Sequence, residues 1–154
     1  MTVMIQGDQV RAITQGILVT RATATMPQGV LGDLFTVIGG RVLIVALLGE
    51  VTTVIQTNVN ATKLVSNPTA TGTSQDLCAT LDITADAVGE MYTISGTVGD
   101  ALRSDLLIGN PLLQDVLVVS AGTIELSCAG SSTGSIKWDL IYVPLDNGAS
   151  VEAA

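Results

Sequence analysis

The sequence predicts an all-β protein, an antiparallel sandwich or barrel of about nine short strands. Valine, isoleucine and threonine supply 49 of the 154 residues, and β-branched side chains pack well on a pleated sheet but lose rotamer freedom in a helix. Clusters of turn-forming residues interrupt the apolar segments at short intervals, which is typical of strands joined by turns. No segment has a long helical period, so a mainly helical fold is excluded.

The first half of the chain is predicted to hold five strands. The first of them is closed by the turn residues Met26-Pro27-Gln28-Gly29. Gly39-Gly40 is typical of a two-residue hairpin loop between neighbouring strands, and Gly49-Glu50 predicts another turn. The predicted strands are 17–24, 33–38, 41–48, 51–57 and 62–65, followed by a loop over 66–75 that is rich in turn residues.

The next segments alternate between apolar and polar positions. Residues 76–83 are predicted to form a half-buried strand, with Cys78 on its polar face. Residues 84–89 can form one helical turn, capped by Thr84 and ended by Gly89. Residues 92–98 alternate again, which predicts another strand. The apolar positions of the two strands are Leu77, Ala79, Leu81 and Ile83 in the first, and Tyr92, Ile94 and Val98 in the second.

Three strands are predicted near the C-terminus. Residues 116–119 are apolar throughout, and Ala121-Gly122 then turns the chain into a strand over 123–128. The last predicted strand, residues 135–143, places Ile136, Trp138, Leu140 and Tyr142 on one face.

The chain is expected to contain one folded domain, because about 150 residues suffice to bury a core without disulfides. No internal repeat at a fixed period suggests a propeller or solenoid. We expect an N-terminal arm over 1–16, a single β-sandwich domain over 17–144 and a C-terminal tail over 145–154. The two end segments lack a clear strand pattern, and arms of this kind can order on a partner.

Composition argues against several partners and compartments. The net charge is -8 and the six Lys and Arg residues are scattered, so no basic surface for nucleic acid or anionic membrane is expected. The longest apolar run, residues 42–48, is far shorter than the roughly 20 residues of a membrane helix. The N-terminus lacks a basic region before an apolar stretch, so we expect synthesis in the cytoplasm without secretion. Only 13% of residues are charged, which favours extensive protein contact and an oligomer.

The two cysteines are expected to remain free thiols. Alternation places Cys128 on the apolar face of its strand and Cys78 on the polar face, so their side chains would point to different sides. A disulfide remains the alternative. Because the chain has no histidine, a cysteine nucleophile activated by a histidine base is excluded.

The carboxylates are the remaining candidates for chemistry. Asp82, Asp86 and Glu90 cluster in the sequence, and Asp100 and Asp105 follow. Their spacing matches no calcium-loop motif, and paired-acid catalysis needs two carboxylates on opposite sides of a cleft. Capping of backbone groups and solubility explain these acids better, so we assign no catalytic, metal-binding or cofactor-binding residue and expect no cofactor and no enzyme activity.

Two further motifs carry little weight. Asn60-Ala61-Thr62 matches a glycosylation sequon, which has no consequence without secretion. Sugar binding usually needs exposed aromatic rings, but Trp138 and Tyr142 share the apolar face of a strand and are expected in the core. The only other aromatic residues are Phe35 and Tyr92.

Three segments resemble small virion proteins of tailed bacteriophages, especially phages of actinobacteria. They are QGDQVRAITQGILVTRATATMPQ at residues 6–28, LCATLDITADAVG at 77–89 and GSIKWDLIYVPLDNGA at 134–149. The resembling family is the head decoration, or capsid cement, proteins, and the likeness runs over nearly the whole chain. It implies a jelly-roll-like β-sandwich without catalytic residues, and it assigns no capsid-contact residue.

The resemblance also implies a function and partners. Proteins of this kind form trimers on the outer surface of the capsid, where they contact the major capsid protein and stabilise the shell. We therefore expect a homotrimeric structural protein located on the virion surface. Two alternatives remain open: a trimeric tail-fibre or receptor-binding module that recognises cell-surface glycan, and a virion-associated glycan hydrolase that uses Asp82, Asp86 and Glu90.

Overall fold

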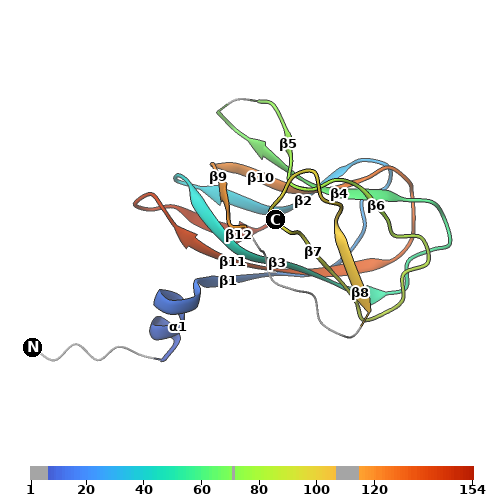
Figure 1. Cartoon of the computed structure of the whole chain (residues 1–154), viewed down its shortest axis with the longest axis horizontal. Helices are drawn as coiled ribbons and strands as arrows, with labels where there is room; N and C mark the ends of the chain where they lie inside the picture. The colour runs from blue at the N-terminus through green and yellow to red at the C-terminus, as the bar shows by residue number, and fades with distance from the viewer. Residues whose placement is uncertain (1–6, 71, 107–114) are drawn as a thin grey trace, which may run out of the picture.

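The computed structural model describes residues 7–70, 72–106 and 115–154, and it shows two antiparallel β-sheets packed as a sandwich (Figure 1). The elements are α1 (Gly7–Gln15), β1 (Ile17–Thr25), β2 (Leu31–Ile38), β3 (Val42–Thr53), β4 (Ala61–Pro68), β5 (Gln75–Asp76), β6 (Leu81–Asp82), β7 (Glu90–Thr93), β8 (Arg103–Leu106), β9 (Leu117–Val119), β10 (Gly122–Cys128), β11 (Ser135–Pro144) and β12 (Ser150–Ala153). Sheet A has the order β1-β11-β3-β7-β8, and β9 also pairs with β3. Sheet B has the order β12-β2-β10-β4-β5, and β6 also pairs with β4.

The strand order is that of a jelly roll. Strands β1 to β4 alternate between sheets A and B as the chain proceeds. The chain then returns so that β10 lies between β2 and β4, and β11 lies between β1 and β3. This interleaving of early and late strands characterises double-sheet jelly rolls. The predicted all-β antiparallel sandwich is confirmed, although the described residues form twelve strands and not about nine.

The core fills the space between the two sheets. The alternation predicted for the β11 region is confirmed, since Ile136, Trp138, Leu140 and Tyr142 are all at most 4% exposed. The Trp138 and Tyr92 rings stack with their centroids 6.4 Å apart. These buried side chains form one cluster with the inward residues of sheet B, which include Phe35, Leu64, Ile124 and Leu126.

Gly49 lies inside β3, and the turn predicted at Gly49-Glu50 is wrong. The segments predicted as separate strands over 41–48 and 51–57 form one strand, Val42–Thr53. Gly49 pairs with Trp138 of β11, and a Cβ atom at Gly49 would lie 2.8 Å from the indole ring. This glycine therefore leaves room for an aromatic ring on the neighbouring strand, which is a recurrent use of glycine within sheets.

The predicted hairpin at Gly39-Gly40 is also wrong. Strands β2 and β3 belong to different sheets, so this connection crosses the sandwich. Ala121-Gly122 likewise separates β9 of sheet A from β10 of sheet B. A turn motif shows where the chain reverses, but the pairing of the flanking strands depends on long-range packing that the motif does not specify.

Arg41 follows the crossing between β2 and β3 and binds Asp146 near the C-terminus. The Arg41 guanidinium donates from Nη2 to Oδ1 of Asp146 at 2.8 Å, and the Arg41 backbone N–H donates to Oδ2 at 2.7 Å. The side-chain hydrogen bond from Arg41 holds the pKa of the Asp146 carboxyl at about 2, below its ordinary value of 3.8. Both side chains are partly exposed, so solvent screens their attraction. The pair therefore fixes the geometry of this connection more than it adds to the stability of the fold.

Replacing Asp146 with asparagine should change the acid stability of the protein. A carboxyl whose pKa is lowered by folding stabilises the folded state above the unfolded pKa, and this contribution is lost as the pH falls toward the folded pKa. In D146N, the decline of unfolding free energy between about pH 4 and pH 2 should be shallower than in wild type. Urea unfolding across this pH range measures the slope, and an unchanged slope would contradict the pairing.

Residues 76–83 do not form the single half-buried strand that was predicted. The chain pairs with β4 at β5 and again at β6, and between them Ala79 bridges to Ala101. The Leu77 N–H donates to the Leu64 carbonyl, and the Ala79 N–H donates to the Asp100 carbonyl. This excursion from the sheet edge turns Cys78 into the core, where it is 1% exposed, so its predicted place on a polar face is wrong.

The connections on either side of β7 also differ from the predictions. Residues 84–89 form turns and not a helical turn, with Ala85 at a positive φ of 63°. The strand expected over 92–98 ends at Thr93, and Val98 is exposed. Strand β8, which pairs with β7, was not predicted, because its sequence RSDL has no clear alternation.

Both end segments contain regular structure that the sequence analysis missed. Residues 7–15 of the predicted arm form α1, which lies outside the two layers beside the start of β1 (Figure 1); residues 1–6 lie outside the described part. Within the predicted tail, Ser150–Ala153 pairs with β2 as β12. The tail prediction failed because a four-residue edge strand is too short to show a period.

Candidate interaction surface

The clustered carboxylates are held by separate local contacts. Oδ1 of Asp82 accepts hydrogen bonds from the Thr84 hydroxyl at 2.6 Å, from the Asn60 N–H at 3.0 Å and from the Thr84 N–H at 3.2 Å. These bonds, led by that of the Thr84 hydroxyl, lower the pKa of Asp82. Asp82 therefore caps a turn, the structural role that the sequence analysis favoured for these acids.

Asp86 and Glu90 are engaged elsewhere. The Tyr92 hydroxyl donates to Oδ2 of Asp86 at 2.5 Å, while burial raises the pKa of the Asp86 carboxyl. Glu90 accepts a hydrogen bond from the Ser104 hydroxyl, and Asp100 accepts one from Ser95 at 2.7 Å. The Asp105 side chain lies outside the described part of the structure. Among the described side chains, no group of three or more acids, cysteines or histidines could hold a metal ion.

Cys78 and Cys128 are free thiols, as predicted, but the reason given for this was wrong. Both are buried and belong to the same core cluster. The Cys78 sulfur accepts a hydrogen bond from the Leu64 N–H at 3.3 Å, and the Cys128 sulfur accepts one from the Thr62 hydroxyl at 3.9 Å. Burial raises the pKa of both thiols, so little reactive thiolate is present near neutral pH.

The native protein should therefore resist thiol reagents. We expect negligible reaction of Cys78 and Cys128 with a disulfide reagent such as DTNB at pH 8, because both sulfurs are inaccessible and protonated. In guanidinium chloride both thiols should react at once. Absorbance of the released thiolate measures the count, and reaction in the native state as fast as in denaturant would contradict the burial.

The aromatic residues and the sequon are buried as well. Phe35, Tyr92, Trp138 and Tyr142 are all at most 4% exposed, so none of them offers a face on which a sugar could stack. This removes the side chains that a glycan-binding module would be expected to use. Asn60 is fully buried, and its side-chain oxygen accepts a hydrogen bond from the Gly130 N–H at 2.9 Å.

The outer faces of the two sheets differ in chemistry. On sheet A, the cross-strand neighbours Val143, Leu43 and Val118 form a row of apolar side chains. Leu18 and Ile141 form a second apolar pair on the same face. Leu18 is 61% exposed and Val118 is 56% exposed. We call this outer patch of sheet A the apolar face; its residues are Leu18, Leu43, Val45, Val118, Ile141 and Val143.

The outer face of sheet B is polar by comparison. The corresponding row across its strands is Glu152, Thr36, Thr123 and Asn67. Thr123 and Asn67 both donate hydrogen bonds to Oε1 of Glu125 on the same face, at 2.5 Å and 3.1 Å. Only sheet A therefore presents a continuous apolar row on its outer surface among the described strands.

Charged groups lie around the apolar face, and Arg11 of α1 lies next to two of its residues. Farther along β11, Lys137 and Asp139 pair with each other at 3.2 Å. At the other end, a groove of about 420 Å³ lies between α1 and the sheet. Its α1 wall holds Arg11, Ala12 and Gln15, and its sheet wall includes Leu18 and Ile141 of the apolar face. The apolar face is thus an uncharged area on a chain of net charge -8, which is the kind of surface that protein partners cover.

No partner-binding residue was predicted from the sequence, although the sequence contains a signal for the apolar face. A half-buried strand alternates, whereas residues 42–48 and 116–119 are apolar at every position. This pattern indicates apolar side chains on both faces of a strand. The extra β3 residue opposite Ile141 also breaks the register there, so alternation alone could not assign Val45 to a face.

No family model, curated protein or solved structure matches this chain. Among the described residues, no helical segment has the length and hydropathy that a membrane span requires.

Proposed function

We propose that the protein is a structural virion protein that binds the outer surface of a phage capsid as an oligomer, expected to be a trimer, and stabilises the shell. The observation that carries this proposal is the apolar face of sheet A, where Leu18 and Val118 remain more than half exposed. The resemblance to head decoration proteins supplies the partner, the major capsid protein.

The apolar face suits association between copies of an acidic chain. At a net charge of -8, two copies repel each other over most approaches. A face without formal charges minimises this repulsion, and covering its side chains removes apolar surface from water at about 25 cal/mol per Å². A stable interface buries about 800 Å² on each partner, so the face and its polar surroundings would be covered together.

Oligomerisation would also explain how weak contacts between each copy and the capsid can stabilise the shell. A trimer that touches neighbouring capsid subunits through each copy links them, and each further contact forms at a high effective concentration. Binding only to the assembled shell stabilises that state by mass action. The shell should then need a higher temperature to rupture when the protein is bound.

Expanded shells prepared without the protein provide the direct test. Purified protein should bind them in a fixed ratio to the major capsid protein and raise the temperature at which they release DNA or lose scattering. Bovine serum albumin at the same concentration is the matched negative control. Absence of binding, or binding without any change in rupture temperature, would contradict the proposal.

A further inference from the structure

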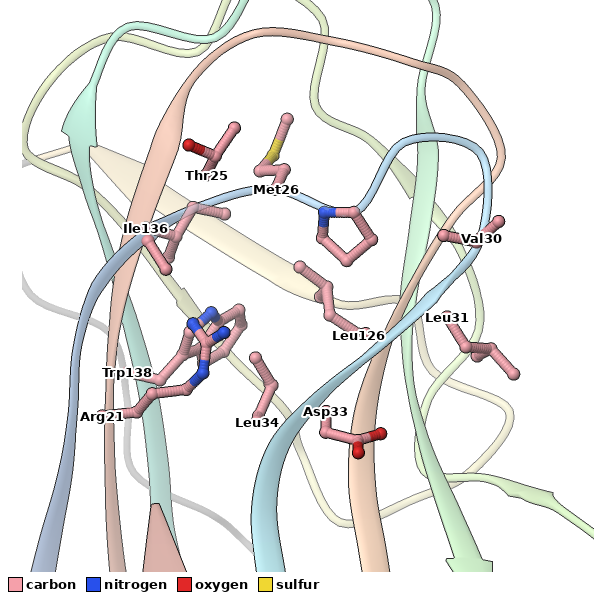
Figure 2. Close-up of a pocket in the computed structure, with 13 residues that line it drawn as sticks. Arg21, Thr25, Met26, Val30, Leu31, Asp33, Leu34, Leu126, Ile136 and Trp138 are labelled. Carbon is pink, nitrogen blue, oxygen red and sulfur yellow. The ribbon is translucent and has the colours of Figure 1, made fainter. Parts of the chain in front are cut away.

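A pocket of about 220 Å³ opens between the two sheets where β1 faces β2. Figure 2 shows the Arg21 guanidinium reaching into it beside the Trp138 ring and near Leu34. Met26, Pro27, Leu126 and Ile136 form an apolar part of the wall, and Thr25 and Asp33 add polar groups to it. Arg21 is therefore the one cation among the lining residues, and Asp33 is the one anion.

Arg21 differs from three of the five other basic residues, which form ion pairs. Arg41, Lys63 and Lys137 each bind a carboxylate within 3.2 Å. In contrast, the Arg21 Nε atom is buried and has no hydrogen-bond partner. A buried donor without a partner is costly, particularly on a charged group. The guanidinium is therefore poised to gain a strong interaction with an acceptor that enters the pocket.

The pocket is accessible because sheet B is incompletely covered at this point. Strand β12 pairs with β2 only from Phe35 to Ile38, and the Ala154 N–H donates to the Leu34 carbonyl. Among the described strands, none pairs with Leu31–Asp33 on that side of β2. The sandwich is thus open where Arg21 lies.

We propose that this pocket binds a carboxylate carried on a short apolar body. A guanidinium offers parallel N–H donors that match the two oxygens of a carboxylate, while the apolar residues of the lining would face the rest of the ligand. The volume accommodates a few carbon atoms. A phosphate dianion is disfavoured relative to a carboxylate, because the pocket holds one cation and the Asp33 carboxylate in its lining repels two charges more strongly than one.

Such a carboxylate can come from a free small acid or from an aspartate or glutamate side chain of a second copy. The two sources present the same chemistry to Arg21. The chain has 14 acidic residues against six basic ones, so a second copy offers many donors of this group. Binding of a carboxylate at Arg21 does not require binding to a capsid.

Trp138 is the only tryptophan in the chain and lines the pocket, so its indole reports occupancy. Sodium butyrate titrated into the whole protein should shift the Trp138 indole N–H resonance or fluorescence saturably, with Kd of about 1 mM, as expected for so small a ligand. Butyramide, which has the same apolar body without the charge, should bind at least about tenfold more weakly. Equal responses to butyrate and butyramide, or no saturable response to butyrate, would overturn the proposal.

Substitutions of Arg21 test whether this side chain causes the response to butyrate. R21Q should abolish the butyrate response, whereas R11Q removes the same charge from an exposed helix position and should leave it intact. R21K keeps the charge but loses the planar guanidinium, so it should bind butyrate more weakly than wild type. This variant provides a test if R21Q folds poorly. Equal butyrate affinity of R21Q and wild type would overturn the assignment.

Protein concentration separates the two sources of the carboxylate. If a second copy fills the pocket, the indole signal should move toward its butyrate-bound position as protein concentration rises, and butyrate should dissociate the copies. If the signal is independent of protein concentration and still responds to butyrate, the ligand is a free acid. Both results support a carboxylate pocket, whereas concentration dependence that persists unchanged in R21Q would contradict filling by a second copy.

Discussion

Replacing Trp138 with alanine is expected to lower the free energy of unfolding by about 3–5 kcal/mol, as for other large core aromatics. Trp138 is 1% exposed, stacks against Tyr92 and covers the space above Gly49. Its removal leaves a cavity between the sheets that the surrounding strands can only partly fill. Urea denaturation followed by circular dichroism measures the change.

Gly49 provides the matched control for this contact. G49A alone should destabilise the protein by about 1–3 kcal/mol, because its Cβ would lie 2.8 Å from the indole ring. In the W138A background the same substitution should cost much less, since the ring is gone. A double-mutant cycle measures the coupling, and additive effects would contradict the Gly49–Trp138 contact.

Aspartate in place of Leu18 should disrupt self-association while preserving the fold. Leu18 is 61% exposed, so the substitution should change unfolding free energy by less than about 0.5 kcal/mol. In an oligomer, however, the new carboxylate would be buried on the apolar face without a partner, which is strongly unfavourable. Sedimentation velocity should show a monomer for L18D under conditions in which wild type is an oligomer.

Substitutions at Val118 and Val59 test whether the effect of L18D is specific to the apolar face. V118D should act like L18D, because both residues lie on the apolar face. V59D places the same charge at a residue that is 71% exposed in a loop, and it should leave the oligomer intact. A monomeric wild type, or equal dissociation by V59D, would contradict association through the apolar face.

The sequence predicted the parts of the fold in which local pattern and tertiary role agree. Strand β11 alternates regularly, and its inward residues are the ones expected. The predictions failed where long-range contacts decided the structure. Gly49 was interpreted as a turn because the ring that fills its place belongs to a strand about 90 residues later, and no local pattern records this.

The surface features were less predictable than the fold. The apolar face depends on strands that are distant in the sequence lying side by side in sheet A. It also depends on Val45, the extra residue of β3, which shifts the alternation along that strand. Arg21 occupies an alternating strand position like any other, and only the packing of β2 against β1 encloses it in a pocket. The composition predicted a protein that contacts other proteins, but it could not predict which residues make those contacts.

The most direct test of the proposed function is the abundance and location of the protein in purified phage particles. Quantitative mass spectrometry should find many copies per particle, in a fixed ratio to the major capsid protein, and immunogold labelling should place them over the whole head. A few copies confined to the tail or to one vertex, or no protein in the particles, would contradict a role in stabilising the capsid.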